Sequence, residues 1–217
     1  MPLLNEQPRI SDVVLMEEGE SVLYTRDNIT VLSGTPPAVV GTVLGAIALG
    51  VATSAVKASG ANTGTGTLVL DAVTPILANA KPGLYTVRVT AVGVAVVTDP
   101  TGVVLGEIDY LPTTAVNFAD RLKFVFTDSA THYVVGDGFD ITVAAGSTKF
   151  VPIGPAALDG SQNAGGVLLT PIPVALVCAA LTRGPAVVKL NGLIWPAGMS
   201  AGAKTAAMAQ LTASASL

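Results

Sequence analysis

Reactive side chains are scarce in this chain of 217 residues. It has one cysteine, one histidine and only 12% charged residues. A single cysteine excludes a disulfide within the chain, so we expect Cys178 to be a small buried side chain in an apolar strand. One histidine and one cysteine, far apart in the sequence, do not make a metal site. The composition therefore predicts neither a metal nor a cofactor.

Basic residues are too few and too scattered to suit a nucleic acid. The chain holds 11 Lys and Arg against 15 Asp and Glu, which gives a net charge of -4. It has no cluster of basic side chains to neutralise a phosphate backbone. We therefore expect no nucleic acid among its partners.

Membrane and secretion signals are also missing. The opening MPLLNEQPRISDVV lacks the basic start and apolar run of a signal peptide, which predicts synthesis in the cytoplasm without secretion. Val39–Val56 (VVGTVLGAIALGVATSAV) is uncharged and near the minimum length of a membrane helix. Its glycines and β-branched residues favour buried strands joined by glycine bends, so we expect no membrane partner.

The residues that are abundant favour short strands. Half of the chain is hydrophobic, but only 5% is aromatic, and 23 Gly and 14 Pro punctuate the apolar stretches. β-Branched residues favour strands, whereas Gly and Pro mark turns. The composition therefore predicts a mainly β fold.

The middle of the sequence differs from its two ends in its pattern of apolar residues and turns. Within residues 62–146, alternating apolar residues are separated by the turn signals KPG, DPTG and GDG. This spacing is typical of an antiparallel β-sandwich of the immunoglobulin type. The ends resemble each other, so we predict that the sandwich is inserted into one small β-rich domain formed by residues 1–61 and 147–217.

One convincing helix is predicted near the end of the sequence. Ala201–Leu211 is rich in good helix formers, and Ser200 precedes it as an N-cap. We expect an amphipathic helix docked on the parent domain. The residues on its apolar face are Ala203, Ala207, Met208 and Leu211. The tail TASASL is predicted to be a weak strand or a loose end.

Candidate catalytic residues are confined to one segment. His132 lies near a turn of the sandwich, with Asp128 and Ser129 close by in the sequence. A hydrolase needs a separate element to hold an oxyanion, and this segment offers none. We interpret His132 as a solvated strand residue and predict that the chain is not an enzyme.

Three loops have the composition of ligand sites but not their full motifs. Asp137–Asp140 (DGFD) and Thr98–Gly102 (TDPTG) do not continue into the ligands of an EF-hand loop, and we interpret both as hairpin turns. Gly60–Gly66 (GANTGTG) lacks the Gly-Lys-Ser/Thr ending that holds a nucleotide. We predict no catalytic, cofactor-binding or metal-binding residues.

Three stretches at the ends of the chain carry a resemblance. They are SDVVLMEEGESVLYTRDNITVLSG (Ser11–Gly34), GTVLG (Gly41–Gly45) and NGLIWPAGMSAGAKTAAMAQL (Asn191–Leu211). Together they resemble the head decoration proteins of tailed bacteriophages, the phage lambda type. In that family a short β-rich domain has a Trp-Pro step before a C-terminal helix, as Trp195 and Pro196 stand here. The inserted sandwich and the polar tail depart from the family pattern.

The resemblance implies a structural protein of the virion. Members of the family form homotrimers on the outside of an expanded capsid, where they clamp the major capsid protein against internal pressure. For this chain it implies location on the outer capsid surface, no enzymatic activity and no cofactor. The implied capsid contact is an N-terminal arm, Pro2–Ile10, that adds to a coat-protein sheet. The arm residues expected to make contact are Leu3, Leu4, Pro8, Arg9 and Ile10.

The family role does not cover the inserted sandwich, which leaves an alternative open. The sandwich is suited to display as an adhesion module that binds a glycan of the host surface. Such binding needs exposed aromatic rings, and several aromatic residues here alternate as core. The residues in question are Tyr85, Tyr110, Phe118, Phe124, Phe126, Tyr133 and Phe139.

Trp195 is the only tryptophan of the chain. An indole covers a large apolar area while its N–H finds an acceptor, which suits an anchor at a strand-to-helix corner. Pro196 ends the strand and Gly198 permits the bend. We expect Trp195 to be part of the core, and its alternative place is the trimer or capsid face.

Overall fold

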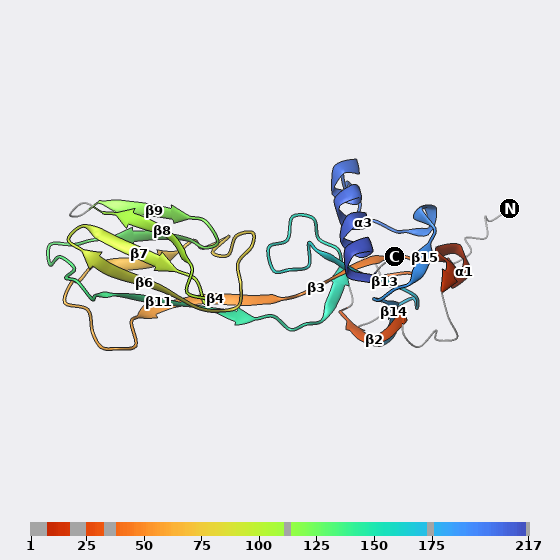
Figure 1. The fold of residues 1–217 in the computed structure, drawn as a ribbon, viewed down its shortest axis with the longest axis horizontal. Helices are drawn as coiled ribbons and strands as arrows, with labels where there is room; N and C mark the ends of the chain where they lie inside the picture. The colour runs from red at the N-terminus through yellow and green to blue at the C-terminus, as the bar shows by residue number, and fades with distance from the viewer. Residues whose placement is uncertain (1–7, 18–24, 33–37, 111–113, 173–175, 216–217) are drawn as a thin grey trace. The chain divides into compact units, whose positions relative to one another are not determined.

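The computed structural model describes residues 8–17, 25–32, 38–110, 114–172 and 176–215. The chain divides into two compact units, which are mainly β (Figure 1). The terminal unit comprises Met1–Ala48 and Thr148–Leu217, and the central unit comprises Leu49–Ser147. Each unit has a hydrophobic core of its own.

Five strands of the terminal unit close into a small barrel. In order around the barrel they are β12 (Phe150–Pro152), β2 (Arg26–Val31), β14 (Leu176–Leu181), β13 (Ala164–Leu168) and β3 (Val43–Ala46). Neighbouring strands are antiparallel except β12 and β2, which are parallel. Val31, Leu44 and Leu168 belong to one apolar cluster of this unit, and Cys178 is buried in the same cluster as predicted.

Short elements surround the barrel. They are α1 (Ile10–Val13), β1 (Val14–Glu17), β15 (Ala186–Val188) and the 3-10 turn η1 (Leu190–Gly192). β1 and β15 form a separate two-stranded antiparallel sheet. The guanidinium of Arg26 on β2 holds the carboxylate of Glu17 on β1 at 2.8 Å, which ties this sheet to the barrel.

The predicted helix is present as α3 (Ala201–Ala215) and packs on β13. The hydroxyl of Ser200 accepts the N–H of Ala203 at 3.2 Å, which confirms the N-cap. Of the four residues expected on its docked side, Ala207 and Leu211 are buried in a second apolar cluster, whereas Ala203 and Met208 are half-buried. The side-chain amide of Gln210 also accepts the N–H of Ala164 on β13 at 2.8 Å.

The prediction for the tail was wrong. Thr212–Ala215 continue α3 instead of forming a strand or a loose end, and the last two residues of the tail lie outside the described residues. The hydroxyl of Thr212 donates to the carbonyl of Met208 one turn earlier, at 3.0 Å. A bond to the carbonyl four residues earlier is a common way for the hydroxyl of a threonine inside a helix to find an acceptor.

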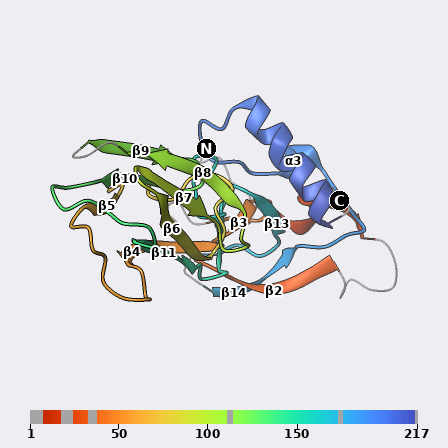
Figure 2. The same cartoon turned by 60° about the vertical axis from the view of Figure 1, so that its left-hand side comes forward.

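The central unit is a sandwich of two antiparallel sheets (Figure 2). The larger sheet has the order β4 (Leu49–Val56), β11 (Gly138–Ala145), β6 (Gly83–Ala91), β7 (Val94–Thr98) and β8 (Val104–Asp109). The smaller has the order β5 (Thr67–Leu70), β10 (Lys123–Thr127) and β9 (Ala115–Ala119). Buried residues of both sheets, among them Tyr85 and Phe126, form one core. The mainly β fold with a C-terminal helix is therefore confirmed.

Tyr85 links its strand to the preceding loop. Its hydroxyl accepts the N–H of Lys81 at 2.7 Å and donates to the carbonyl of Lys81 at 3.1 Å. A buried tyrosine that bonds back to the backbone a few residues upstream is the tyrosine corner of Greek-key sandwiches.

The central unit begins earlier than the sequence analysis placed it. The sequence pattern predicts a start at residue 62, whereas the compact unit starts at Leu49. The reason is that β4 pairs with β11 along its length, with Thr53 opposite Thr142. The apolar run 39–56 thus divides into β3 of one unit and β4 of the other. Among the described residues, no helix is long and apolar enough to span a membrane.

The central unit interrupts the terminal unit between two neighbouring strands. Ala46 of β3 pairs with Phe150 of β12, and the N–H of Ile47 donates to the carbonyl of Lys149 at 2.9 Å. Within the central unit, Leu49 pairs with Ala145. The chain therefore enters and leaves each unit on adjacent strands, as an inserted domain requires.

Candidate functional site

The segment with the candidate catalytic residues holds no relay from a nucleophile to a base. Nδ1 of His132 lies 2.9 Å from a carboxylate oxygen of Asp128. The hydroxyl of Ser129 instead bonds the hydroxyl of Thr65 at 2.6 Å and the carbonyl of Thr131 at 3.1 Å. Serine and histidine thus have different partners. In the described part of the chain, no three His, Cys, Asp or Glu side chains group as metal ligands.

Asp137 of the acidic turn organises the glycine-rich loop 60–66. Its carboxylate accepts the N–H groups of Thr63 at 3.0 Å, Gly64 at 3.0 Å and Val134 at 3.1 Å. Burial acts to raise the pKa of Asp137, but these N–H donors and the Lys57 ammonium outweigh it and lower the pKa. The loop that resembles a nucleotide site is therefore a packing element.

The TDPTG turn is closed by its own aspartate. Asp99 accepts the N–H groups of Thr101 at 2.8 Å and Val103 at 2.9 Å. Its other oxygen pairs with Arg121 at 2.6 Å and Lys81 at 3.3 Å. A carboxylate with these partners is occupied by the protein itself, which confirms the interpretation as a turn.

The aromatic residues considered for sugar binding are all in the core of the central unit. Each is buried, and the rings of Phe126, Tyr133 and Phe139 contact one another at centroid distances of 5.1 to 6.0 Å. A ring stacks on a sugar only where its face is exposed. These seven residues therefore give the glycan alternative no support.

The structure describes only part of the predicted arm. Leu3 and Leu4 lie outside the described residues, whereas Pro8 is half-buried and Arg9 and Ile10 are exposed. The N–H of Arg9 donates to the carboxylate of Asp12 at 2.8 Å, which fixes the start of α1.

Trp195 lies at the edge of the core. It is half-buried and packs with Met199 against the second apolar cluster. The N–H of Ile194 donates to the carbonyl of Gly41 at 2.8 Å, so the residue before the tryptophan is fixed to the barrel. The N–H of Met199 then donates to the carbonyl of Pro196 at 3.2 Å and closes the corner before α3. The side chain therefore takes part in the core and also reaches the surface.

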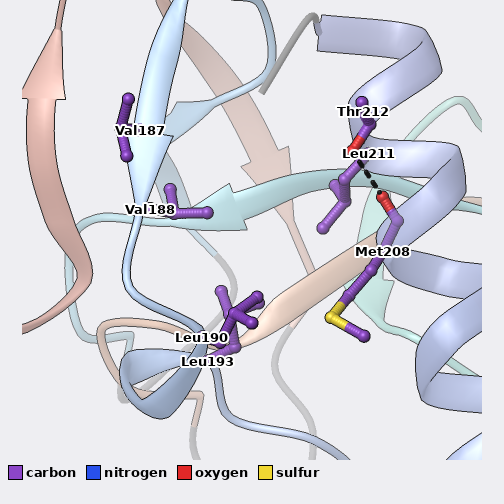
Figure 3. A pocket seen from close by; sticks show the side chains of 7 residues that line it. All are labelled: Val187, Val188, Leu190, Leu193, Met208, Leu211 and Thr212. Atoms are coloured by element: carbon purple, nitrogen blue, oxygen red, sulfur yellow. Dashed lines mark hydrogen bonds between the residues drawn. The ribbon is translucent and has the colours of Figure 1, made fainter.

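An apolar hollow of about 250 Å³ lies between α3 on one side and β15 and η1 on the other (Figure 3). The residues that line it are Val187, Val188, Leu190, Leu193, Met208, Leu211 and Thr212. None of them is titratable, and Leu190 and Val187 are exposed. Met16, which pairs with Val187, is exposed as well. We name this surface, from Met16 to Met208, the apolar face.

No local sequence pattern predicts the apolar face, because its residues come from segments far apart in the chain. One signal was present: Lys204 is the only charged residue in α3. A helix on the surface of a soluble protein normally has a charged outer side. An outer side of small uncharged residues is a surface that a protein partner can cover.

Comparisons with known proteins give one family. The model of the family described as Bacteriophage lambda head decoration protein D matches residues 3–216. A search of curated proteins found no relative of the chain. Two crystal structures of Xanthomonas campestris FlgL match at 22% and 24% identity, each with a TM-score of 0.32. They cover 49% and 51% of this chain, which spans only 33% and 32% of theirs.

Proposed function

The chain belongs to the family of the bacteriophage lambda head decoration protein D, and from this premise we propose that it binds an expanded phage head as a trimer and stabilises it. Proteins of this family are structural and non-enzymatic, and they sit on the capsid surface. The observation that carries the proposal is the extent of the match. Residues 3–216 include both halves of the terminal unit.

We assign capsid binding to the terminal unit. Its two halves hold the stretches that resemble the family, including the corner at Trp195 and helix α3. It also has the apolar face, where Met16, Val187 and Leu190 are exposed. Exposed apolar surface of this kind is what a protein partner covers. In a trimer, one patch of each subunit meets a different patch of its neighbour in a closed ring.

We assign the contact with the major capsid protein to the arm, residues 2–10. An arm that adds a strand to a coat-protein sheet gains main-chain hydrogen bonds, and apolar side chains add specificity. Leu3 and Leu4 supply the apolar side chains of this segment. A trimer carries three arms that can engage the capsid together. Three modest contacts then give a much higher overall affinity than one contact does.

Replacing Leu3 and Leu4 together with serine is expected to weaken binding to expanded heads by at least about 100-fold, since each leucine that becomes buried contributes about 1.5 to 3 kcal/mol. Binding is measured by co-sedimentation of the protein with purified expanded and unexpanded heads. The unchanged protein should sediment with expanded heads only.

The matched control replaces two exposed valines of the central unit, Val73 and Val92, which are 86% and 93% exposed. Serine at both positions is expected to leave binding unchanged. Equal binding of the arm variant and the control would contradict the role of the arm. Failure of the unchanged protein to bind expanded heads would contradict the proposed function.

A further inference from the structure

Strand β4 is an open edge of the larger sheet of the central unit. In the described part of the chain, it lies at the end of the strand order and pairs with β11 alone (Figure 1). Its last four residues, Thr53–Val56, are all exposed, so neither face of the strand is covered there. An edge strand offers a row of main-chain N–H and C=O groups to a further strand. β4 can therefore accept a strand from another molecule.

The hydrogen-bond pattern identifies the free main-chain groups of β4. The N–H of Lys57 donates to the carbonyl of Gly138 at 3.1 Å, in register with the pairing of β4 and β11. Along an antiparallel ladder, residues alternate between those that direct their N–H and C=O groups to the neighbouring strand and those that direct them away. Lys57 is of the first kind. The groups of Val56, Ser54 and Ala52 therefore point away from β11.

The loop that follows β4 leaves this edge accessible. It turns back over β11, where the N–H of Ala58 donates to the carboxylate of Asp140 at 2.9 Å. The side-chain amide of Asn62 then accepts the N–H of Gly138 at 2.9 Å and donates to its carbonyl at 3.0 Å. Both anchors hold the loop on the β11 side of β4, opposite to the free groups.

The other edge strands of the sandwich are shorter or charged. β5 has four residues and β9 has five, and β8 carries the exposed carboxylates of Glu107 and Asp109. Short edges and charged side chains are two ways in which proteins prevent unwanted strand pairing. β4 has eight residues, LGVATSAV, without a charge or a proline. Among the described edge strands of the central unit, β4 is thus the one that lacks both protections.

A second copy of β4 is complementary to this edge. In an antiparallel pair of two copies, the register with Ser54 opposite Ser54 also places Ala52 opposite Val56. Every outward N–H and C=O group of these residues then has a partner in the other copy, whereas any shifted register leaves some of them unpaired. Because the strand is uncharged, the two-fold axis brings no like charges of β4 together.

We propose that β4 is an interface between copies of this chain, in which two central units pair antiparallel with Ser54 opposite Ser54 and join their larger sheets into one. This contact goes beyond the proposed function, in which the terminal unit alone binds the capsid. A two-fold contact cannot close a ring of three. On a head, and if the proposed function holds, the contact therefore joins copies that belong to different trimers.

A charge at Ser54 tests the proposal in the full chain. Pairing is measured by sedimentation equilibrium over a range of concentrations, as a doubling of the mass in solution. Ser54→Lys should weaken pairing about fivefold, because two ammonium groups then face each other across the axis. The matched control, Val92→Lys, adds the same charge at a position outside β4 that is 93% exposed, and should change nothing. Equal pairing of the two variants, or no pairing of the unchanged protein, would overturn the proposal.

A mixture of variants separates charge repulsion from misfolding. Ser54→Lys and Ser54→Glu should each pair weakly alone, but their equimolar mixture should pair at least as well as the unchanged protein, because opposite charges then meet. A variant that fails to fold cannot regain pairing in this way. A mixture that pairs no better than either variant would contradict the register.

Ser54→Cys tests the register directly. Opposed residues of a bonded pair have Cα atoms about 5.5 Å apart, which a disulfide can span. Mild oxidation should therefore link two chains of Ser54→Cys but not of the control Val92→Cys, as read on non-reducing gels. Cys178 is not expected to compete, because it is buried and burial raises the pKa of its thiol. Equal linkage in the two variants would count against the pairing.

Expanded heads distinguish this contact from the proposed function. Ser54→Lys should sediment with them as the unchanged protein does, because its terminal unit is unaltered. Loss of head binding in Ser54→Lys alone would show that β4 contacts the coat protein instead of a second copy, and would overturn the proposal. Failure of the unchanged protein to bind heads would count against the proposed function, and the pairing would still be decided in solution.

Discussion

Gly41→Ala is expected to unfold the terminal unit or to lower its free energy of unfolding by about 3 kcal/mol or more. Gly41 has φ +92, where an alanine is strained, and an added Cβ would lie 2.2 Å from the carbonyl oxygen of Gly192. The backbone cannot easily shift to relieve this overlap, because the N–H of Gly41 donates to the carbonyl of Leu168 and the carbonyl of Gly41 accepts the N–H of Ile194, both at 2.8 Å. The measurement is chemical denaturation followed by the fluorescence of Trp195, which reports on the terminal unit alone.

The control for this variant is Gly202→Ala on α3. A Cβ there meets nothing within 4 Å, and alanine favours a helix over glycine by up to about 1 kcal/mol. Gly202→Ala should therefore leave the unfolding midpoint unchanged or raise it. Equal midpoints for Gly41→Ala and the unchanged protein would show that α1, η1 and the barrel are not packed as described.

Asp137→Asn is expected to destabilise the central unit by about 3 kcal/mol or more, because it removes a buried charge that joins two segments. The carboxylate joins the glycine-rich loop, through Thr63 and Gly64, to the turn at Val134. The measurement is denaturation followed by near-ultraviolet circular dichroism of the buried tyrosines. Asp109→Asn, at an exposed position of β8, serves as the control and should change stability by less than about 0.5 kcal/mol.

The same carboxylate gives the central unit a defined acid sensitivity. Because the pKa of Asp137 is lowered in the folded state, its stabilisation is present above the unfolded value of about 3.9 and is lost as pH falls through the folded pKa. Asp140 acts in the same direction: burial opposes the shift, but bonds from Arg88 and Ala58 lower its pKa. The free energy of unfolding, measured from pH 7 to pH 2, should therefore decrease once the pH is below about 4. This decrease should be less steep in Asp137→Asn. Identical acid profiles would contradict this role.

Local signals predicted the helix and the turns well. Ser200 and the alanine-rich stretch after it determine where α3 begins, since N-capping and helix propensity act within a few residues. The turn at Asp99 is likewise closed by N–H groups two and four residues away, whereas Asp137 accepts one N–H from nearby Val134 and two from the distant loop 60–66. The helix was predicted to end at Leu211, which is too early, because the threonine and serine residues that follow are compatible with a helix as well as with a strand or a loose end.

Longer-range features could not be derived in the same way. The sequences of β3 and β4 are both apolar and contain glycine, so they look alike. Only the pairing of β4 with β11 assigns β4 to the central unit. The hollow brings Leu190 beside Met208, and no periodicity in the sequence links these two residues. Trp195 was expected in the core; it packs against the second apolar cluster but is only half-buried, and its extent of burial depends on long-range packing.

The most direct test of the account is a cryo-electron microscopy map of expanded heads decorated with the full chain. We expect density for three copies around each local three-fold position, with the terminal unit against the coat protein and the arm, residues 2–10, continuous with a coat-protein sheet. We also expect no contact between Leu49–Ser147 and the coat. A map in which the central unit forms the capsid contact, or in which the copies do not form trimers, would contradict it.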